Sequence, residues 1–162
     1  MDWREAFLLQ ARSDFAVLIK LNKSAVEDCH RLHYLQMAAE KLGKAMLSRP
    51  GSMLPPVTTH AAFARMLQVL KSSPEVRRHL GFNDPAIFKR YIDSLLPLAE
   101  RIERLAPALA GMKQPNPEYP WADAVVGEVF APAAFAFTEF NPKRAQMIKM
   151  MELMQSLLTM GV

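Results

Sequence analysis

The stretch that decides the fold runs from Ser24 to Leu47 and reads SAVEDCHRLHYLQMAAEKLGKAML. Its apolar residues recur every three or four positions, as they do along one face of a helix. Ser24 and Glu27 have the spacing of a capping box, so we expect this helix to begin there. Gly43 costs a helix about 1 kcal/mol relative to Ala, which indicates close packing against another helix. The inward stripe is predicted to be Leu32, Leu35, Ala39, Leu42 and Met46.

Further helices are expected on both sides of this stretch. Helical spacing predicts a first helix over residues 2–21, and the short turn at residues 22–23 predicts that it lies antiparallel to the second. Thr58 or Thr59 is the expected cap of a third helix. A polar cap followed by proline marks three more starts, at Ser73-Pro74, Asp84-Pro85 and Asn141-Pro142.

The later part of the chain is less regular. The helix after Asp84 should reach about residue 109. Pro97 must kink or break it, and we expect two helical pieces that meet just before Pro97. Residues 111–140 are expected to be an irregular, Pro-rich segment, and the last helix covers residues 143–160, with Gly161 as its stop. No sustained strand alternation occurs. The sequence therefore predicts an all-α fold: a single up-and-down helical bundle of four to five principal helices, forming one domain over residues 1–162.

Composition sets broad limits on function. The chain has 162 residues, 51% of them hydrophobic and 22% charged, as in globular domains. Lys and Arg exceed Asp and Glu by 20 to 16, a mild excess that permits nucleic acid as a partner without demanding it. Lone Cys29 forms no internal disulfide, and no metal-ligand spacing occurs, so we expect no metal or cofactor. No signal peptide or membrane span is recognisable, and we expect a cytoplasmic protein without a membrane partner.

The segment Tyr34–Leu47, YLQMAAEKLGKAML, resembles the second-helix signature of HEPN domains. Two weaker similarities to the same family are Thr59-His60 and residues 118–121, EYPW. The resemblance implies a HEPN-like helical bundle. It also implies that enzymatic relatives are metal-independent ribonucleases with an Arg-x4–6-His motif, in which His transfers protons and Arg stabilises phosphate charge.

The ribonuclease motif itself is missing. None of the positions five to seven before His30, His33, His60 or His79 is Arg. We therefore predict no ribonuclease activity by that route. The rival hypothesis is a site completed by remote residues or by a partner, with His60 as its base.

Several residues are candidates for RNA or nucleotide contact. His33 lies in a cluster with His30, Arg31 and Tyr34, although neighbours on a helix more often point in different directions. Arg77-Arg78-His79 and Lys89-Arg90 form the densest basic patch, which is more often a solvated face. The side of the organising helix that carries Lys41 and Lys44 also has solvated character, and Lys44 has a helical pair partner in Glu40. Tyr119 lies in the EYPW loop, whose aromatic rings could instead plug the end of the bundle. The candidates are His33, Lys41, Lys44, Arg77, Arg78 and Tyr119.

The last helix is apolar over more than one stripe. Its Met residues, which adapt well to partner surfaces, are Met147, Met150, Met151 and Met154. We interpret them as a partner interface, the alternative being a helix central to its own core. The sequence thus predicts a non-catalytic HEPN-like module that dimerises or docks onto a protein partner in a toxin–antitoxin or defence assembly. The alternative is an RNA-cleaving or RNA-binding HEPN protein.

Overall fold

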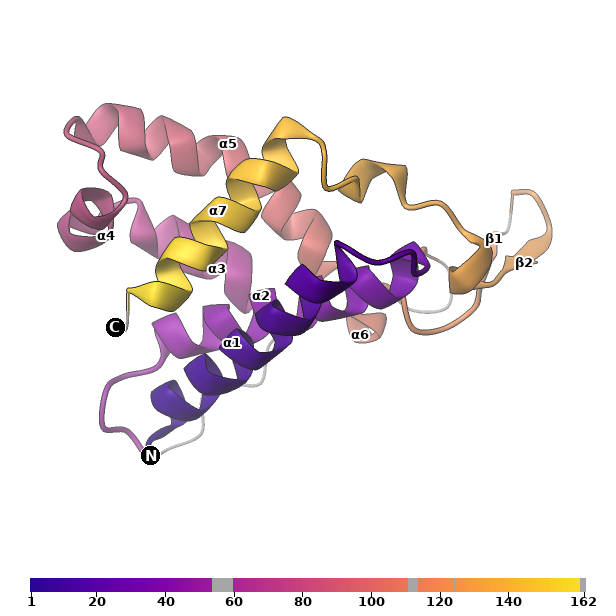
Figure 1. Cartoon of the computed structure of the whole chain (residues 1–162), viewed down its shortest axis with the longest axis horizontal. Coiled ribbons are helices and arrows are strands. Elements are labelled where there is room, and N and C mark those ends of the chain that lie inside the picture. The colour runs from indigo at the N-terminus through magenta and orange to yellow at the C-terminus, as the bar shows by residue number, and fades with distance from the viewer. Residues whose placement is uncertain (54–59, 111–113, 124, 161–162) are drawn as a thin grey trace.

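The computed structural model describes residues 1–53, 60–110, 114–123 and 125–160. Helices make up most of this part of the chain, and two short strands pair in one hairpin (Figure 1). The predicted helical class is therefore confirmed, with the hairpin as an addition. The α-helices and β-strands are α1 (Trp3–Leu21), α2 (Asp28–Leu47), α3 (Ala62–Leu70), α4 (Pro74–His79), α5 (Pro85–Glu103), α6 (Pro107–Ala110), β1 (Trp121–Asp123), β2 (Glu128–Phe130) and α7 (Ala145–Thr159).

Helix α2 lies at the centre of the molecule. It packs along α1, which runs antiparallel to it as predicted, and it also contacts α3, α5 and α7 (Figure 1). Its predicted stripe faces inward: Leu32 and Leu42 are fully buried, and Met46 is half-buried. The organising role of this stretch is confirmed.

Gly43 marks the point where α2 meets the beginning of α3. A Cβ atom at Gly43 would lie 2.7 Å from the carbonyl carbon of Ala62 and 2.7 Å from the amide nitrogen of Phe63. Real Cβ atoms do not approach backbone atoms so closely, and backbone cannot swing aside as a long side chain can. The predicted close approach of a second helix at Gly43 is confirmed.

The helix starts agree with the sequence in part. Ser73 and Asp84 cap α4 and α5, each followed by proline at the first helical position. The expected capping box of α2 is wrong, because Glu27 precedes the helix without a side-chain cap bond and the Ser24 hydroxyl donates to the Leu21 carbonyl at 2.9 Å. A capping box forms instead at α1, between Asp2 and Glu5.

Two other expected boundaries need comment. Asn141-Pro142 forms a turn in which Asn141 Oδ1 accepts from the amide of Lys143 at 2.9 Å, and α7 begins only at Ala145. The predicted start at residue 143 is therefore two residues early. The cap at Thr58 or Thr59 and the stop at Gly161 lie outside the described residues.

Pro97 kinks α5, which is one of the two predicted outcomes, but it does not divide the chain here into two helices, so the expected separate pieces are wrong. The helix continues from Pro85 to Glu103, and its axis bends between the two halves in Figure 1. Pro97 is exposed, so water can bond the carbonyl that the missing N–H leaves free. The result is a kinked helix instead of a broken one, and it ends six residues earlier than expected.

The segment expected to be wholly irregular contains the hairpin. Strands β1 and β2 pair antiparallel, with Trp121 opposite Phe130 and Ala122 opposite Val129. Asp123 Oδ1 accepts from the amides of Val125 and Val126, at 2.8 and 3.2 Å, which shapes the turn. With three residues each, these strands are too short for the alternation that reveals a strand in sequence.

The hairpin projects from the helical body. Figure 1 shows β1 and β2 beyond the ends of α1 and α2, while α4 and the beginning of α5 lie at the opposite end of the molecule. We call strands β1 and β2, with Val125, Val126 and Gly127 between them, the arm.

Candidate functional site

Glu40 of α2 gathers polar side chains next to the beginning of α3. Its carboxylate accepts from Gln36 Nε2 at 2.8 Å and from Lys44 Nζ at 2.6 Å, and it lies 2.9 Å from Nδ1 of His60. The Glu40 side chain is 13% exposed, whereas that of His60 is 45% exposed. The cluster therefore has a buried carboxylate and a histidine that reaches solvent.

The hydrogen bonds of this cluster keep Glu40 ionised. Burial by itself raises the pKa of Glu40, but hydrogen bonds from Lys44, His60 and Gln36 outweigh it, so the pKa lies below its ordinary value. A carboxylate next to Nδ1 favours the imidazole tautomer whose proton is on Nδ1. His60 Nε2 is then the nitrogen that can accept a proton.

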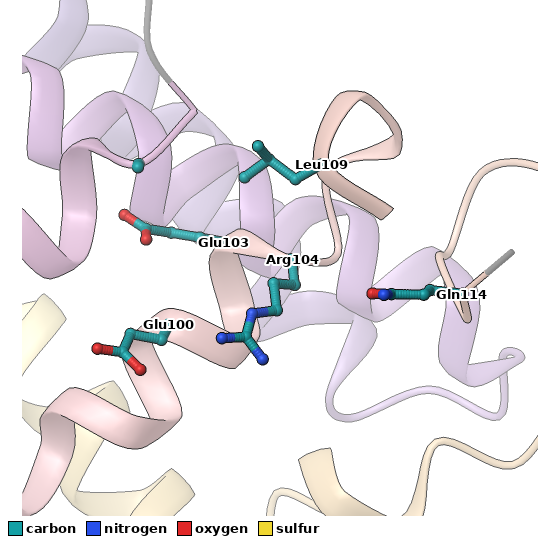
Figure 2. A pocket seen from close by; sticks show the side chains of 6 residues that line it. Glu100, Glu103, Arg104, Leu109 and Gln114 are labelled. Atoms are coloured by element: carbon teal, nitrogen blue, oxygen red, sulfur yellow. The ribbon is translucent and has the colours of Figure 1, made fainter. Parts of the chain in front are cut away.

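A pocket of about 360 Å³ begins at Ala61, directly after His60. Figure 2 shows the side chains of Glu100, Glu103 and Arg104 leaving the last turns of α5, with Leu109 and Gln114 on its other sides. The pocket thus combines two carboxyl groups with one guanidinium group.

Glu103 has a structural role in this pocket. Its side chain is buried, and Oε1 accepts from the amide of Ala64 at 2.9 Å, which satisfies one free N–H in the first turn of α3. Burial raises the pKa of Glu103; hydrogen bonds from the amides of Ala64 and Phe63 oppose this, and the charges of Glu100 and Glu40 add to it. Glu103 is thus a remote cap for α3.

Of the residues predicted to contact RNA, His33 and Tyr119 lie near the base of the arm. His33 Nδ1 lies 3.2 Å from a carboxylate oxygen of Glu118 and so links α2 to the loop before the arm. Tyr119 is 54% exposed, while Trp121 is buried, so only the Trp plugs the interior. The backbone of Tyr119 donates to Asn116 Oδ1 at 2.8 Å, which fixes the loop.

The simpler interpretation, that the neighbours of His33 point in different directions, holds for His30 and Arg31, whereas the ring of Tyr34 meets that of His33 edge to face at 5.1 Å. His30 is exposed, whereas Arg31 is buried and donates to the carbonyl of Phe140 at 3.1 Å and to Asp28 at 2.6 Å. Arg31 therefore ties the segment before α7 to α2. It is not placed to contact a nucleic acid.

Lys41 and Lys44 are not a solvated face, so that interpretation is wrong. Lys41 Nζ pairs with the largely buried carboxylate of Asp14 at 2.5 Å, and Lys44 pairs with Glu40. Both lysine side chains are less than one-fifth exposed. A charge that is already neutralised by an ion pair and partly buried attracts phosphate only weakly. The structure therefore gives neither lysine an RNA-binding arrangement.

Arg77 and Arg78 lie on α4, whereas Glu40 lies on α2 and His60 just before α3. Arg77 donates to the carbonyls of Phe82 and Asn83 and so shapes the connection to α5, whereas Arg78 is exposed and donates to Pro74. The predicted candidates therefore occupy three separate places and do not form one site.

The predicted Met interface on the last helix is wrong for three of its four residues. Met147, Met150 and Met154 are at most 2% exposed and belong to the core, and Met151 is only partly buried. Helix α7 contacts α1, α2 and α5, so its wide apolar surface is covered within the chain. The alternative interpretation, a helix central to its own core, is the one observed.

The arm is the surface that sequence reasoning missed. Val125 is 96% exposed, Val129 75% and Val126 58%. Its other face is anchored: Trp121 stacks on Phe130 and meets Phe135 edge to face. The sequence signal for the arm was the Asp-x-x-x-Gly pattern of a turn at residues 123–127, with three valines in and just after it.

Charge separates the arm from the rest of the chain. Residues 114–140 hold four acidic residues and no Lys or Arg, so all 20 basic residues of the chain lie elsewhere. Glu118 lies against His33 and Glu139 against Arg101, so the negative charge left over is that of Asp123 and Glu128 on the arm. The acidic residues are Glu118, Asp123, Glu128 and Glu139.

No family model, curated protein or solved structure matches this chain. In the described ranges no three His, Cys, Asp or Glu side chains are arranged to hold a metal ion. None of the helices drawn in Figure 1 is both long and apolar enough to cross a membrane. Function must therefore be argued from the arm and from the His60 cluster.

Proposed function

We propose that the protein is a non-catalytic interaction module that docks through its arm onto a basic, partly apolar protein surface. One observation carries this proposal: Val125 and Val129 are exposed on an acidic hairpin that projects from the body. Apolar side chains held out in water gain free energy when a partner covers them.

The arm is organised before it binds. Asp123 fixes the turn, Gly127 adopts a positive φ of 72°, and Trp121 fastens the inner face to the core. A surface that is already ordered loses little conformational entropy on binding, which favours affinity.

Charge selects the class of partner. Glu128 is exposed, and it makes no ion pair within the described residues. Its carboxylate repels phosphate and attracts Lys or Arg, so the arm suits a basic protein surface and disfavours nucleic acid. The HEPN resemblance suggests that such a module would serve a nucleic-acid-related assembly of the toxin–antitoxin or defence type.

Photo-crosslinking from the arm tests this proposal. A photoreactive residue in place of Val129 should form an adduct with one protein in the cells of origin, and mass spectrometry would identify it. The purified pair should then bind, and Val125→Ser/Val129→Ser should weaken binding at least tenfold. High salt should weaken it too, because screening shortens the reach of charge.

A matched control uses exposed Leu9 on α1, which is 56% exposed. A photoreactive residue at position 9 should not give the same adduct, and Leu9→Ser should leave affinity unchanged. If Val129 gives no protein adduct, or the same adduct as position 9, the arm is not a docking element.

A second candidate function rests on the hydrogen bond between His60 and Glu40 beside the pocket. RNA carries its own nucleophile, so His60 Nε2 could remove the 2′-hydroxyl proton while that oxygen attacks phosphorus. The bond from phosphorus to the 5′-oxygen then breaks, which leaves a 2′,3′-cyclic phosphate, and the departing 5′-oxygen takes a proton from water. Arg104 in the pocket could stabilise the phosphate, although Glu100 and Glu103 oppose it. No metal enters this route.

Incubation with labelled RNA tests the second candidate. Cleavage that falls at least tenfold in His60→Ala and in Glu40→Gln, but not in His79→Ala, would support it. His79 is the control because it is also exposed and bonded, in its case to the Ser156 carbonyl at 3.2 Å. Absent cleavage, or equal cleavage in all variants, would exclude it.

A further inference from the structure

We propose that the partner of the arm is a second copy of this chain, which receives it on the basic surface where α5 begins. This inference rests on the proposed function and goes further by naming the partner. It places two different surfaces in contact, the arm of one copy and the start of α5 in the next.

The receiving surface is apolar at its centre and basic around it. Ile87 is 47% exposed on the first turn of α5, and Ala86 beside it is also exposed. Lys89 and Arg90 follow on the same two turns, and no acidic side chain of the described residues pairs with either. Ile87 and Arg90 are three residues apart, so they are neighbours on one helix face.

Two acidic residues next to this surface are already engaged. Asp84 caps α5, its carboxylate accepting from the amide of Ala86 at 2.6 Å. Asp93 pairs with Lys71 from the end of α3. Between Lys71 and Asp93 the chain has five basic and three acidic residues, so the surface remains positive.

The arm and the receiving surface are complementary both in their apolar side chains and in their charge. Val125 and Val129 can cover Ile87 and its neighbours, while Glu128 can approach Arg90. Opposite charges around an apolar centre give orientation as well as affinity.

Geometry requires that the contact be made between molecules. The arm and the beginning of α5 lie at opposite ends of the molecule in Figure 1, so one copy cannot join its own two surfaces. Contact between unlike surfaces of identical chains is heterologous, and it continues to a ring or an open chain. The small arm predicts weak association, with Kd in about the micromolar range.

Solution mass is the first measurement. Light scattering on the parent should give a mean mass that rises with concentration beyond that of a dimer and falls toward the 18.3 kDa monomer at high salt. Val125→Ser/Val129→Ser and Ile87→Ser/Arg90→Glu should each remain monomeric. All of these residues are exposed, and circular dichroism checks that the fold is retained.

Mixing the two variants is the decisive step. The first keeps a receiving surface and the second keeps an arm, so an equimolar mixture should form one-to-one dimers and nothing larger. A contact between two arms, or between two α5 surfaces, would not give this result. The control mixture, Leu9→Ser with the α5 variant, should instead form assemblies larger than a dimer, because Leu9→Ser keeps both surfaces and can associate with itself as well as with the α5 variant.

Each outcome decides between the two proposals. A parent that stays monomeric at all concentrations, or a variant mixture that stays monomeric, overturns the second-copy inference. If Val129 then still crosslinks to a different protein, the docking function stands with another partner. If Val129 crosslinks to nothing, both proposals fail.

Discussion

The rings of Trp121 and Phe130 face each other across the two strands of the hairpin, with centroids 6.0 Å apart and planes inclined by 17°. Phe135 and Phe137 pack around the same indole, at 5.0 and 6.2 Å. Trp121 is 3% exposed although it lies in a strand of the projecting arm. This aromatic cluster is therefore the anchor that holds the arm to the helical body.

Replacing Trp121 with Ala should free the arm and destabilise the protein. Loss of a buried Trp side chain typically costs about 3–5 kcal/mol, because it removes apolar contact and leaves a cavity. Urea denaturation measures the change. Tyr119→Ala is the control, since this exposed ring should change stability by less than about 0.5 kcal/mol. Equal effects of the two substitutions would mean that the indole is not an anchor.

Gly43→Ala should destabilise the protein even though Ala is the better helix former. The gain in helix propensity is about 1 kcal/mol, but overpacking against fixed atoms typically costs about 1–3 kcal/mol. The backbone of Ala62 and Phe63 is what the new methyl group meets. Thermal unfolding should show a lower Tm, while Gln68→Ala on the exposed side of α3 should not. A higher Tm for Gly43→Ala would contradict the close approach.

The helices could be predicted because their signals are local. The apolar spacing of residues 32–46 and the Ser73 and Asp84 caps each act within one or two turns, so the sequence itself carries them. The kink at Pro97 could be predicted from the sequence. That the helix continues through Pro97 could not, because this depends on Pro97 facing water in the folded protein. The α2 start was misplaced because Ser24 is used by the turn that ends α1.

The functional surfaces were harder to predict because they depend on what covers them. The Met pattern of α7 is the same for a core helix and for an interface, and only the packing of α1, α2 and α5 around it decides. Glu40 and His60 are 20 residues apart, and Glu103 meets Ala64 across 39. Pairings of this length come from tertiary structure. The absent Arg-to-His spacing, in contrast, could be read directly.

Met150→Glu/Met154→Glu should unfold the protein. Both side chains are 0% exposed, so the variant would bury two unpaired charges among apolar neighbours. Each such charge costs several kcal/mol, and domains of this size have about 5–15 kcal/mol of stability in total. Circular dichroism should show loss of helix. Ile148→Glu, at a position 44% exposed on the same helix, should stay folded. A folded double variant with altered solution mass would restore the interface interpretation.

Glu103 should make stability depend on pH above the ordinary carboxyl range. Burial is the main cause of its raised pKa, so the folded protein holds this proton more tightly than the unfolded chain does. The stabilising contribution is therefore complete below the unfolded pKa, near 4.5, and is lost as pH rises through the higher folded pKa. Glu103→Gln cannot ionise, yet its amide oxygen can still accept from Ala64.

The difference in unfolding free energy between Glu103→Gln and the parent isolates this effect. It should move in favour of the variant as pH rises above about 4.5, because only the parent must ionise a buried carboxyl group. Glu40, whose pKa is lowered, loses its contribution at acidic pH in both proteins and so cancels. Exposed Glu100→Gln serves as the control and should give a nearly flat difference. If the difference in unfolding free energy for Glu103→Gln is also independent of pH, then the Glu103 carboxyl group is solvated at the beginning of α3 and its pKa is not raised.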